Sequence, residues 1–328
     1  TPGGRTETLS ASVTSYTAME NGTYTFTLKK DGKTVKKEVT VERIDCTSPT
    51  VSFSSLPEGW QQQFPNVTIS GEDGSGAAAS GITSLKYKLV TEKGEYPTEG
   101  LLEAEVSGDK VDSQAISGED AVNGLNYIYY IAQDAAGNTI QGYSSAIRVD
   151  GTVPTLAVEA SVSEGSAAMF KVTATFGVSG GDVAFQKQSE EAVYPVSGNT
   201  QEDGDGSYTF TAEPGVSEEG TYTFTVTTGA GKTATVNAPT IYRITLNANG
   251  GSFDPEDPDA DTDTWLVVEG GRITPPEGDN QQKPERKGYT LKGWYTGQDL
   301  QTEHDSAQTV SGTMTLYAGW TTIPSATS

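Results

Sequence analysis

Acidic side chains concentrate in residues 254–263, which read Asp-Pro-Glu-Asp-Pro-Asp-Ala-Asp-Thr-Asp. Calcium prefers about six to eight hard oxygen ligands, and closely spaced carboxylates supply them. The candidate ligands are Asp254, Glu256, Asp257, Asp259, Asp261 and Asp263. The alternative is a solvated, self-repelling loop that its prolines hold open. The sequence indicates no cofactor other than this calcium ion.

Side chains suited to catalysis are scarce. The chain has one histidine, His304, in a polar stretch, and one cysteine, Cys46, far from it in the sequence. No G-x-S-x-G elbow or phosphate-binding glycine motif accompanies them, and a zinc site lacks a ligand set. Carboxylate pairs for glycoside hydrolysis remain open by number, but none lies in an apolar run that would raise its pKa. We therefore expect a protein without enzymatic activity.

Two tryptophans are candidates for stacking against a sugar ring. Trp60 lies among glycine and glutamine residues, and Trp265 opens the apolar run to Val268. An exposed indole offers a flat apolar face to a ligand. The competing interpretation is packing in a core or at a strand edge.

The segments that would position these residues are short and alternate with period two, as β-strands do. Clear examples are Tyr24–Leu28, Phe170–Ala174, Tyr208–Thr211 and Tyr222–Val226. Each alternation predicts an apolar face turned inward and a Thr or Lys face turned outward. No segment shows a sustained helical pattern.

These strands recur as a unit of an opening strand, a turn and a return strand, at a spacing of about 100 residues, the size of one β-sandwich. The units open at Asn21, Asn123 and Glu219, and their turns lie at Asp31-Gly32, Ala136–Asn138 and Gly229–Gly231. The first two units are followed by Ile44–Thr50 and Val149–Thr155, which share the pattern apolar-Asp-x-Thr-x-Pro-Thr. Proline ends the ladder of strand hydrogen bonds, so we place module boundaries there.

The chain carries a net charge of -23. Such a surface repels phosphate backbones and anionic lipid, which argues against nucleic-acid partners. The sequence contains no apolar run of about 18 residues, the length that would predict membrane insertion. The 15 Tyr, 9 Phe and 4 Trp supply core material for several domains.

The segment from Asp45 to Asp150 resembles the bacterial immunoglobulin-like modules of surface proteins. The matching residues are Asp45, Pro49, Thr50, Trp60, Val67–Ser70, Asp73-Gly74-Ser75-Gly76, Ser80–Ile82, Tyr87 and Tyr130–Asn138. The last range carries aromatic-x-Ala-x-Asp-x-Ala-Gly-Asn, which is similar to the final hairpin of that family. Residues 150–240 match more loosely.

The segment from Tyr242 to Thr322 resembles the internalin-type B repeat, also called the Listeria–Bacteroides repeat. The matching stretches are Ile244–Gly251, Pro284–Thr296 and Thr313–Trp320. The resemblance implies a small β-grasp-like module on a bacterial surface protein. The acidic segment 254–263 departs from the family pattern by lengthening the first loop.

The predicted fold class is all-β, with tandem immunoglobulin-like β-sandwiches and a small β-grasp-like repeat module. The predicted divisions are 1–44, the C-terminal half of an immunoglobulin-like module; 45–149 and 150–240, immunoglobulin-like domains; 241–322, the B repeat; and 323–328, a tail. We expect Tyr127, Tyr222, Trp294 and Trp320 in the cores, and Pro49 and Pro154 in the linkers.

The expected function is a non-enzymatic stalk or spacer, with an adhesion role, in a larger bacterial cell-surface or secreted protein. We expect an extracellular location on a Gram-positive cell wall, a monomer, and a host protein, matrix protein or glycan as the candidate partner. The alternatives are a carbohydrate-binding accessory region of a secreted glycoside hydrolase and a calcium-dependent adhesin.

Overall fold

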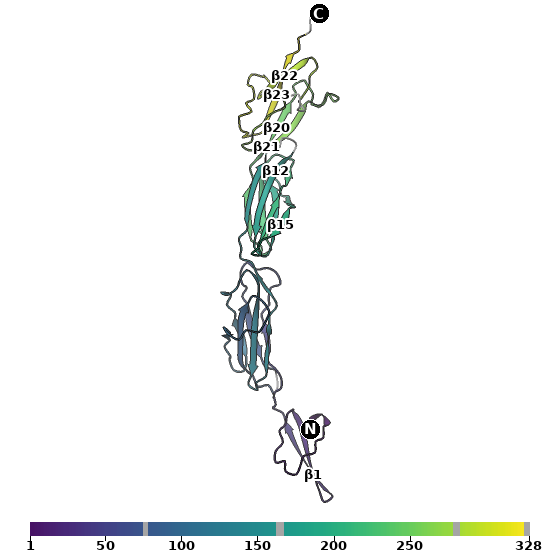
Figure 1. Cartoon of the computed structure of the whole chain (residues 1–328), viewed down its shortest axis with the longest axis vertical. Coiled ribbons are helices and arrows are strands. Elements are labelled where there is room, and N and C mark those ends of the chain that lie inside the picture. The colour runs from purple at the N-terminus through teal and green to yellow at the C-terminus, as the bar shows by residue number, and fades with distance from the viewer. Residues whose placement is uncertain (75–77, 162–166, 278–282, 325–328) are drawn as a thin grey trace. The chain divides into compact units, whose positions relative to one another are not determined.

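A computed structural model describes residues 1–74, 78–161, 167–277 and 283–324 (Figure 1). These residues form strands almost throughout, apart from a short 3-10 turn, η1 (Pro2–Gly4), so the predicted all-β class is confirmed. None of the described segments is a helix of the length and hydrophobicity needed to cross a bilayer. The chain divides into two compact units, Thr1–Asp150 and Gly151–Ser328. The division into four modules and a tail stays a prediction, and residues 325–328 of that tail lie outside the described residues.

Residues 1–44 form a two-stranded antiparallel hairpin of β1 (Gly22–Lys30) and β2 (Lys33–Val41). The predicted turn lies at Asp31 and Gly32, whose φ angles are 50° and 73°. Two successive positive φ values give a turn whose twist matches the twist of paired strands, and Asp-Gly is a favoured sequence for it. The turn chemistry therefore fixes the register of the hairpin.

The apolar face of this hairpin is incompletely covered, which corrects the expectation of an inward face over Tyr24–Leu28. Tyr24 is buried, but Phe26 is 37% and Leu28 is 69% exposed. The Tyr16 ring packs against the rings of Tyr24 and Phe26, with centroids 5.8 Å apart in each pair. Residues 1–44 contain no second sheet that could cover this face. A two-stranded ribbon without a second layer cannot bury a whole face.

The first sandwich occupies the rest of unit 1. One sheet has the order β3-β4-β7, and the other has the order β10-β8-β5-β6 with β9 also paired to β8. The strands are β3 (Thr50–Phe53), β4 (Thr68–Glu72), β5 (Ile82–Val90), β6 (Leu102–Glu103), β7 (Val111–Ala115), β8 (Gly124–Asp134), β9 (Thr139–Tyr143) and β10 (Ile147–Val149). Ile69, Leu85, Ile128 and Ile147 are fully buried between the sheets.

The chain crosses this sandwich from one end to the other along β8. Asp45, just before the first strand, lies beside Asp134 at the end of β8. Val149, the last residue of β10, pairs with Gly124 at the start of β8. An 11-residue strand spans roughly 35 Å at ~3.3 Å per residue. Entry and exit therefore lie at opposite ends of the module.

The second sandwich opens unit 2 and shows two antiparallel sheets. Their orders are β11-β12-β16-β15, with β17 also paired to β12, and β14-β13-β18-β19. The strands are β11 (Thr155–Ser161), β12 (Ala168–Phe176), β13 (Gly181–Lys187), β14 (Val193–Pro195), β15 (Asn199–Glu202), β16 (Tyr208–Ala212), β17 (Gly215–Val216), β18 (Tyr222–Thr228) and β19 (Thr233–Asn237). Phe170, Phe176 and Phe224 are fully buried in the core.

A glycine with positive φ lies at or just before the start of the aromatic strand in all three hairpins. Gly22, Gly124 and Gly220 have φ values of 136°, 118° and 141°, a region that side chains with a Cβ rarely adopt. In the first and third hairpins a tyrosine hydroxyl then donates to the carbonyl four residues earlier, Tyr24 to Glu20 and Tyr222 to Glu218, both at 2.8 Å. The repeated sequence unit thus corresponds to a repeated strand entry.

The last module is one mixed sheet in the order β21-β20-β23-β22. Its strands are β20 (Ile241–Asn247), β21 (Thr262–Val268), β22 (Tyr289–Tyr295) and β23 (Met314–Thr322). The central pair, β20 and β23, is parallel, and the outer pairs are antiparallel. Trp294 is 1% exposed and packs against Phe253 in the core.

The second sandwich and the repeat module share a core. Ile241, Leu266 and Val268 come from β20 and β21, yet they belong to the apolar cluster of the sandwich. At the edge of this contact, Arg243 Nε donates to Glu219 Oε1 at 3.1 Å, and the Thr313 hydroxyl donates to Glu219 Oε2 at 2.8 Å. These contacts join two modules that the sequence places on either side of residue 240.

Two of the four predicted core aromatics are buried, and two are half-buried. Tyr222 and Trp294 are 4% and 1% exposed, and Trp320 is half-buried against the repeat core. Tyr127 is also half-buried and does not belong to the core cluster of the first sandwich; the Lys93 ammonium lies 4.8 Å from its ring centroid. Pro49 and Pro154 are buried, each directly before the Thr that begins β3 or β11.

Candidate metal centre and other candidate sites

Three aspartates meet at one end of the first sandwich. Asp45, Asp73 and Asp134 each bring one carboxylate oxygen within 4.8 Å of the others. Asp73 and Asp134 are 7% and 2% exposed, and Asp45 is half-buried. No other group of three metal-ligating side chains this close occurs in the described ranges.

The ends of three strands position these aspartates. Asp73 directly follows β4 and Asp134 is the last residue of β8, whereas Asp45 lies in the segment that leads into β3. β3 pairs with β4 in one sheet, and β8 belongs to the facing sheet. The sandwich therefore gathers residues far apart in the sequence at a single end.

Backbone N–H groups hold each carboxylate in place. Asp73 Oδ2 accepts from the amides of Ser80 and Gly81, both at 2.9 Å. Asp134 Oδ1 accepts from the amide of Asn138 at 2.8 Å, and Asp45 Oδ2 accepts from the amide of Ser80 at 3.0 Å. Hydrogen bonds from the backbone of the turns thus restrict the rotation of these three side chains.

One oxygen of this cluster has no protein partner. Asp73 Oδ1 is buried and accepts no hydrogen bond from any described residue. Buried polar atoms are nearly always paired, because desolvation without a partner costs free energy. Like charges at this separation also repel one another unless a cation lies among them.

Two further oxygen-bearing groups lie beside the three carboxylates, namely the Asn138 side-chain amide and the backbone carbonyl of Asp45. The Asn138 side-chain amide donates to Asp134 Oδ2 at 2.8 Å and to the Asp45 carbonyl at 3.4 Å. A half-turn of that amide would present its oxygen instead. A hydrogen bond from the Ser80 side chain, followed by bonds from Thr47, lowers the pKa of Asp45, so this carboxylate is ionised at neutral pH.

The sequence contained these aspartates only as members of the immunoglobulin-like motifs. Asp73 and Asp134 each come before a glycine-containing turn sequence, whereas Asp45 comes before Cys46-Thr47, so the three share no local pattern. Their convergence depends on the strand order, which residue types alone do not reveal. Ser75 and Gly76 of the same motif lie outside the described residues.

The acidic segment predicted to bind calcium follows β20 and extends into the start of β21, where Asp263 lies. Asp254, Glu256, Asp257, Asp259 and Asp261 are exposed, and Asp263 is half-buried. Asp254 Oδ1 accepts from the amide of Glu256 at 2.9 Å, and Asp257 Oδ1 accepts from the amide of Asp259 at 3.0 Å. These carboxylates cap their own turns and do not converge as a trio, so calcium binding here stays a prediction.

The two candidate stacking tryptophans have different surroundings. Trp265 is half-buried on β21, packs against the core of the repeat module and donates its indole N–H to Asp263 Oδ2 at 2.9 Å. Trp60 is half-buried in the loop before β4, next to Gln61, which pairs with Val149. Their role in sugar binding stays a prediction.

The two residues considered for catalysis lie in different units. The His304 ring contacts the carbonyl of Ile273 through Nε2 at 3.2 Å. Cys46 is exposed in the linker after Asp45. Neither lies within a described arrangement of nucleophile and base.

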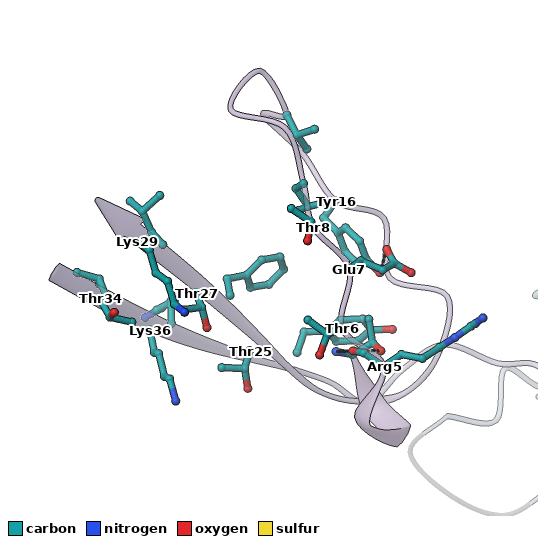
Figure 2. A pocket seen from close by; sticks show the side chains of 18 of the residues that line it. Arg5, Thr6, Glu7, Thr8, Tyr16, Thr25, Thr27, Lys29, Thr34 and Lys36 are labelled. Carbon is teal, nitrogen blue, oxygen red and sulfur yellow. Dashed lines mark hydrogen bonds between the residues drawn. The ribbon is translucent and has the colours of Figure 1, made fainter. Parts of the chain in front are cut away.

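A hollow of about 1160 Å³ lies over the hairpin of residues 1–44, between the strands and the segment from Thr1 to Tyr16 (Figure 2). Much of its lining is apolar, including Leu9, Val13, Phe26 and Leu28. Tyr16 donates to Glu7 Oε2 at 3.4 Å, and burial followed by the Glu7 charge raises the pKa of Tyr16. This hollow is the uncovered face of the ribbon.

A comparison with protein-family models finds a match in the last part of the chain. Residues 242–319 match the Listeria-Bacteroides repeat domain family, which supports the prediction of this repeat. A search of curated protein sequences finds no match.

A comparison with solved structures finds matches of low sequence identity and low TM-score. Bovine butyrophilin is 13% identical, with a TM-score of 0.34, and the match covers 57% of this chain and 97% of that one. The eight N-terminal immunoglobulin domains of Down Syndrome Cell Adhesion Molecule are 9% identical at a TM-score of 0.22, covering 91% and 44%. Human desmocollin-1 ectodomain is 14% identical at a TM-score of 0.24, covering 63% and 39%. The sheet topology described above, rather than these superpositions, defines the fold.

Proposed function

We propose that this chain is a non-enzymatic spacer region of a larger bacterial cell-surface or secreted protein, and that its modules hold another part of that protein away from its attachment point. The observation that carries this proposal is the path of the chain through each sandwich. A module whose entry and exit lie at opposite ends adds its full length to the distance between its neighbours.

The second sandwich has the same arrangement as the first. At its entry, the Lys232 ammonium donates to the carbonyl of Gly151, close to the end of β18 at Thr228. At its exit, the amide of Ala238 donates to the carbonyl of Tyr222, at the start of β18. The chain therefore crosses this module along β18 as it crosses the first along β8.

The match of residues 242–319 to a repeat family supports an extracellular setting for the proposal. The net charge of -23 would keep a crowded surface protein soluble. We place the chain on the outside of a Gram-positive cell, with a host protein, matrix protein or glycan as the partner of an added adhesion role.

Spin labels on the full chain test the spacer geometry. Cys46 is an exposed cysteine at the entry of the first sandwich, and Leu125→Cys adds a second label at its exit. Pulsed dipolar spectroscopy should give a distance of roughly 35 Å, the length of β8. Ala136→Cys is the matched control, because Ala136 lies at the same end as Cys46, and its distance should be shorter by about 20 Å or more. Equal distances for the two pairs would eliminate the spacer proposal.

The accessory role in a glycoside hydrolase predicts sugar binding through the indoles. The half-exposed Trp60 is the better placed of the two, because Trp265 packs on a core. On a glycan array, that role requires a signal that Trp60→Ala removes while the melting temperature is unchanged. A chain that binds no glycan would leave the spacer as the proposed function.

A further inference from the structure

We propose that Asp45, Asp73 and Asp134 form a calcium site at the entry of the first sandwich. The Asp45 carbonyl and the Asn138 side-chain oxygen, after a half-turn of the amide, complete the protein ligands. This inference is independent of the spacer function, because the site would bind the ion whatever the module supports.

The first argument is the unpartnered oxygen. Asp73 Oδ2 accepts two amides, so the side chain is held firmly while Oδ1 faces no donor from the described residues. A buried carboxylate fixed in this way, with two other carboxylates within 4.8 Å, presents a set of acceptors that a cation would satisfy at once.

The second argument is a comparison within the chain. Thr228 in the second sandwich has the position of Asp134: each accepts, through a side-chain oxygen, the amide four residues on, from Lys232 or Asn138. Strand pairing places Phe176 where Asp73 lies, since Thr155 pairs with Thr175 as Thr50 pairs with Glu72. Two of the three aspartates are therefore absent from the second sandwich.

The residue at the Asn138 position shows what replaces them. Lys232 donates its ammonium to the carbonyl of Gly151 in the entry segment, as Asn138 donates to the carbonyl of Asp45. At this position the second sandwich therefore has the positive charge of a lysine side chain. The first sandwich has a neutral amide and three carboxylates there, which is the composition of a site for a free cation.

The ligand chemistry selects calcium among common metals. All candidate ligands are oxygens, and no histidine or cysteine side chain belongs to the group, which disfavours zinc and copper. The ligands come from two turns and a linker rather than from a rigid octahedral frame, which suits the flexible coordination of Ca²⁺ better than Mg²⁺. A bound ion would tie the entry segment to both sheets of the module.

Isothermal titration calorimetry of the full chain with CaCl₂ tests the site. We expect binding with a Kd of about 10⁻⁴–10⁻³ M, as in extracellular modules. Asp73→Asn should weaken binding at least about tenfold, while an oxygen of the new amide can still accept the Ser80 and Gly81 N–H groups. Asp112→Asn is the control, because Asp112 is an exposed carboxylate of the same module that pairs with Lys110. It should bind calcium as the wild type does.

Melting curves give a readout that distinguishes a metal site from a structural carboxylate. In EDTA, Asp73→Asn should melt above the wild type, because it removes a charge from a crowded cluster. In calcium the order should reverse. A merely structural Asp73 would make the variant less stable in both conditions, and that result would overturn the proposal.

A third variant places in the first sandwich the lysine that the second sandwich has at the position of Asn138. Asn138→Lys should supply the cation from the chain itself, so that the melting temperature in EDTA rises toward the calcium-loaded value and the response to calcium disappears. The paired substitutions Asp257→Asn and Asp259→Asn separate the acidic loop from the cluster. Calcium binding that this pair abolishes and Asp73→Asn leaves intact would overturn the proposal, as would wild-type protein that binds no calcium at 10 mM.

Discussion

The carboxylates of this chain differ in how their oxygens are occupied. In the acidic loop, Asp254 and Asp257 each accept the amide two residues on and remain exposed to water. Asp73 is buried and keeps one oxygen without a described partner. Residue type is the same in both places, so composition directs attention to the loop, whereas burial and hydrogen bonding direct it to the cluster.

Glu219 gives a prediction for the dependence of stability on pH. A hydrogen bond from Thr313, and then the Arg243 guanidinium, lower the pKa of Glu219 below its ordinary value of 4.5. Because the folded-state pKa is the lower one, this stabilisation is complete above pH 4.5 and is lost as the pH falls through the folded-state pKa. Glu219→Gln should lower the melting temperature of unit 2 at pH 7.

The difference between Glu219→Gln and the wild type should narrow as the pH falls below 4.5, the ordinary pKa, and vanish at lower pH. Thermal melts across pH 2–7 measure it, with Glu213→Gln as an exposed-carboxylate control in the same unit. A gap that stays constant with pH would contradict the role of the Glu219 charge.

At the scale of elements, the same alternation leads to two different environments. Tyr24–Leu28 and Tyr222–Val226 are nearly the same sequence, but Phe26 is 37% exposed and Phe224 is fully buried. The difference is the second sheet, which the sandwich supplies and the hairpin lacks. An alternating pattern predicts a strand and its apolar face, and only the neighbouring layer determines whether that face is buried.

This pair of phenylalanines is a matched test. Phe224→Ala should destabilise unit 2 by about 3–5 kcal/mol, through lost burial and a cavity. Phe26→Ala should cost less than about 1 kcal/mol, because a partly exposed side chain leaves no enclosed cavity. Calorimetry of the full chain measures both. Similar effects at the two positions would show that the hairpin is covered in solution.

The elements that sequence could predict are those determined by local chemistry. The Asp31-Gly32 turn and the glycines at the starts of the aromatic strands are local, and the structure shows both. The motifs of the repeat module are also local, and the family match covers them. The Asp45–Asp73–Asp134 cluster and the core shared across residue 240 depend on which strands become neighbours. Neither has a local signature, so neither could be predicted.

At the scale of the whole molecule, the shared core predicts how unit 2 unfolds. Ile241 is 1% exposed and packs in the sandwich cluster, although it begins the first strand of the repeat module. Ile241→Ala should remove about 2–5 kcal/mol of stability and lower one common transition of the sandwich and the repeat. Unit 1 should melt as before.

Hydrogen exchange measured by mass spectrometry checks this coupling by following peptides from β18 and β23 separately. Both should lose protection to the same degree in Ile241→Ala. Loss confined to one of the two strands would mean that the modules unfold independently. Thr240→Ala, next to it and half-buried, is the control.

The apolar contact of Ile241, Leu266 and Val268 also bears on how such modules can be exchanged between genes. Recombination at residue 150 separates two compact units, whereas recombination at residue 240 would uncover three large aliphatic side chains on one partner and leave a gap in the other. A transplanted repeat would need either its original neighbour or new polar residues at these positions. The unit that recombination can exchange intact in this part of the chain is therefore the second sandwich together with the repeat module.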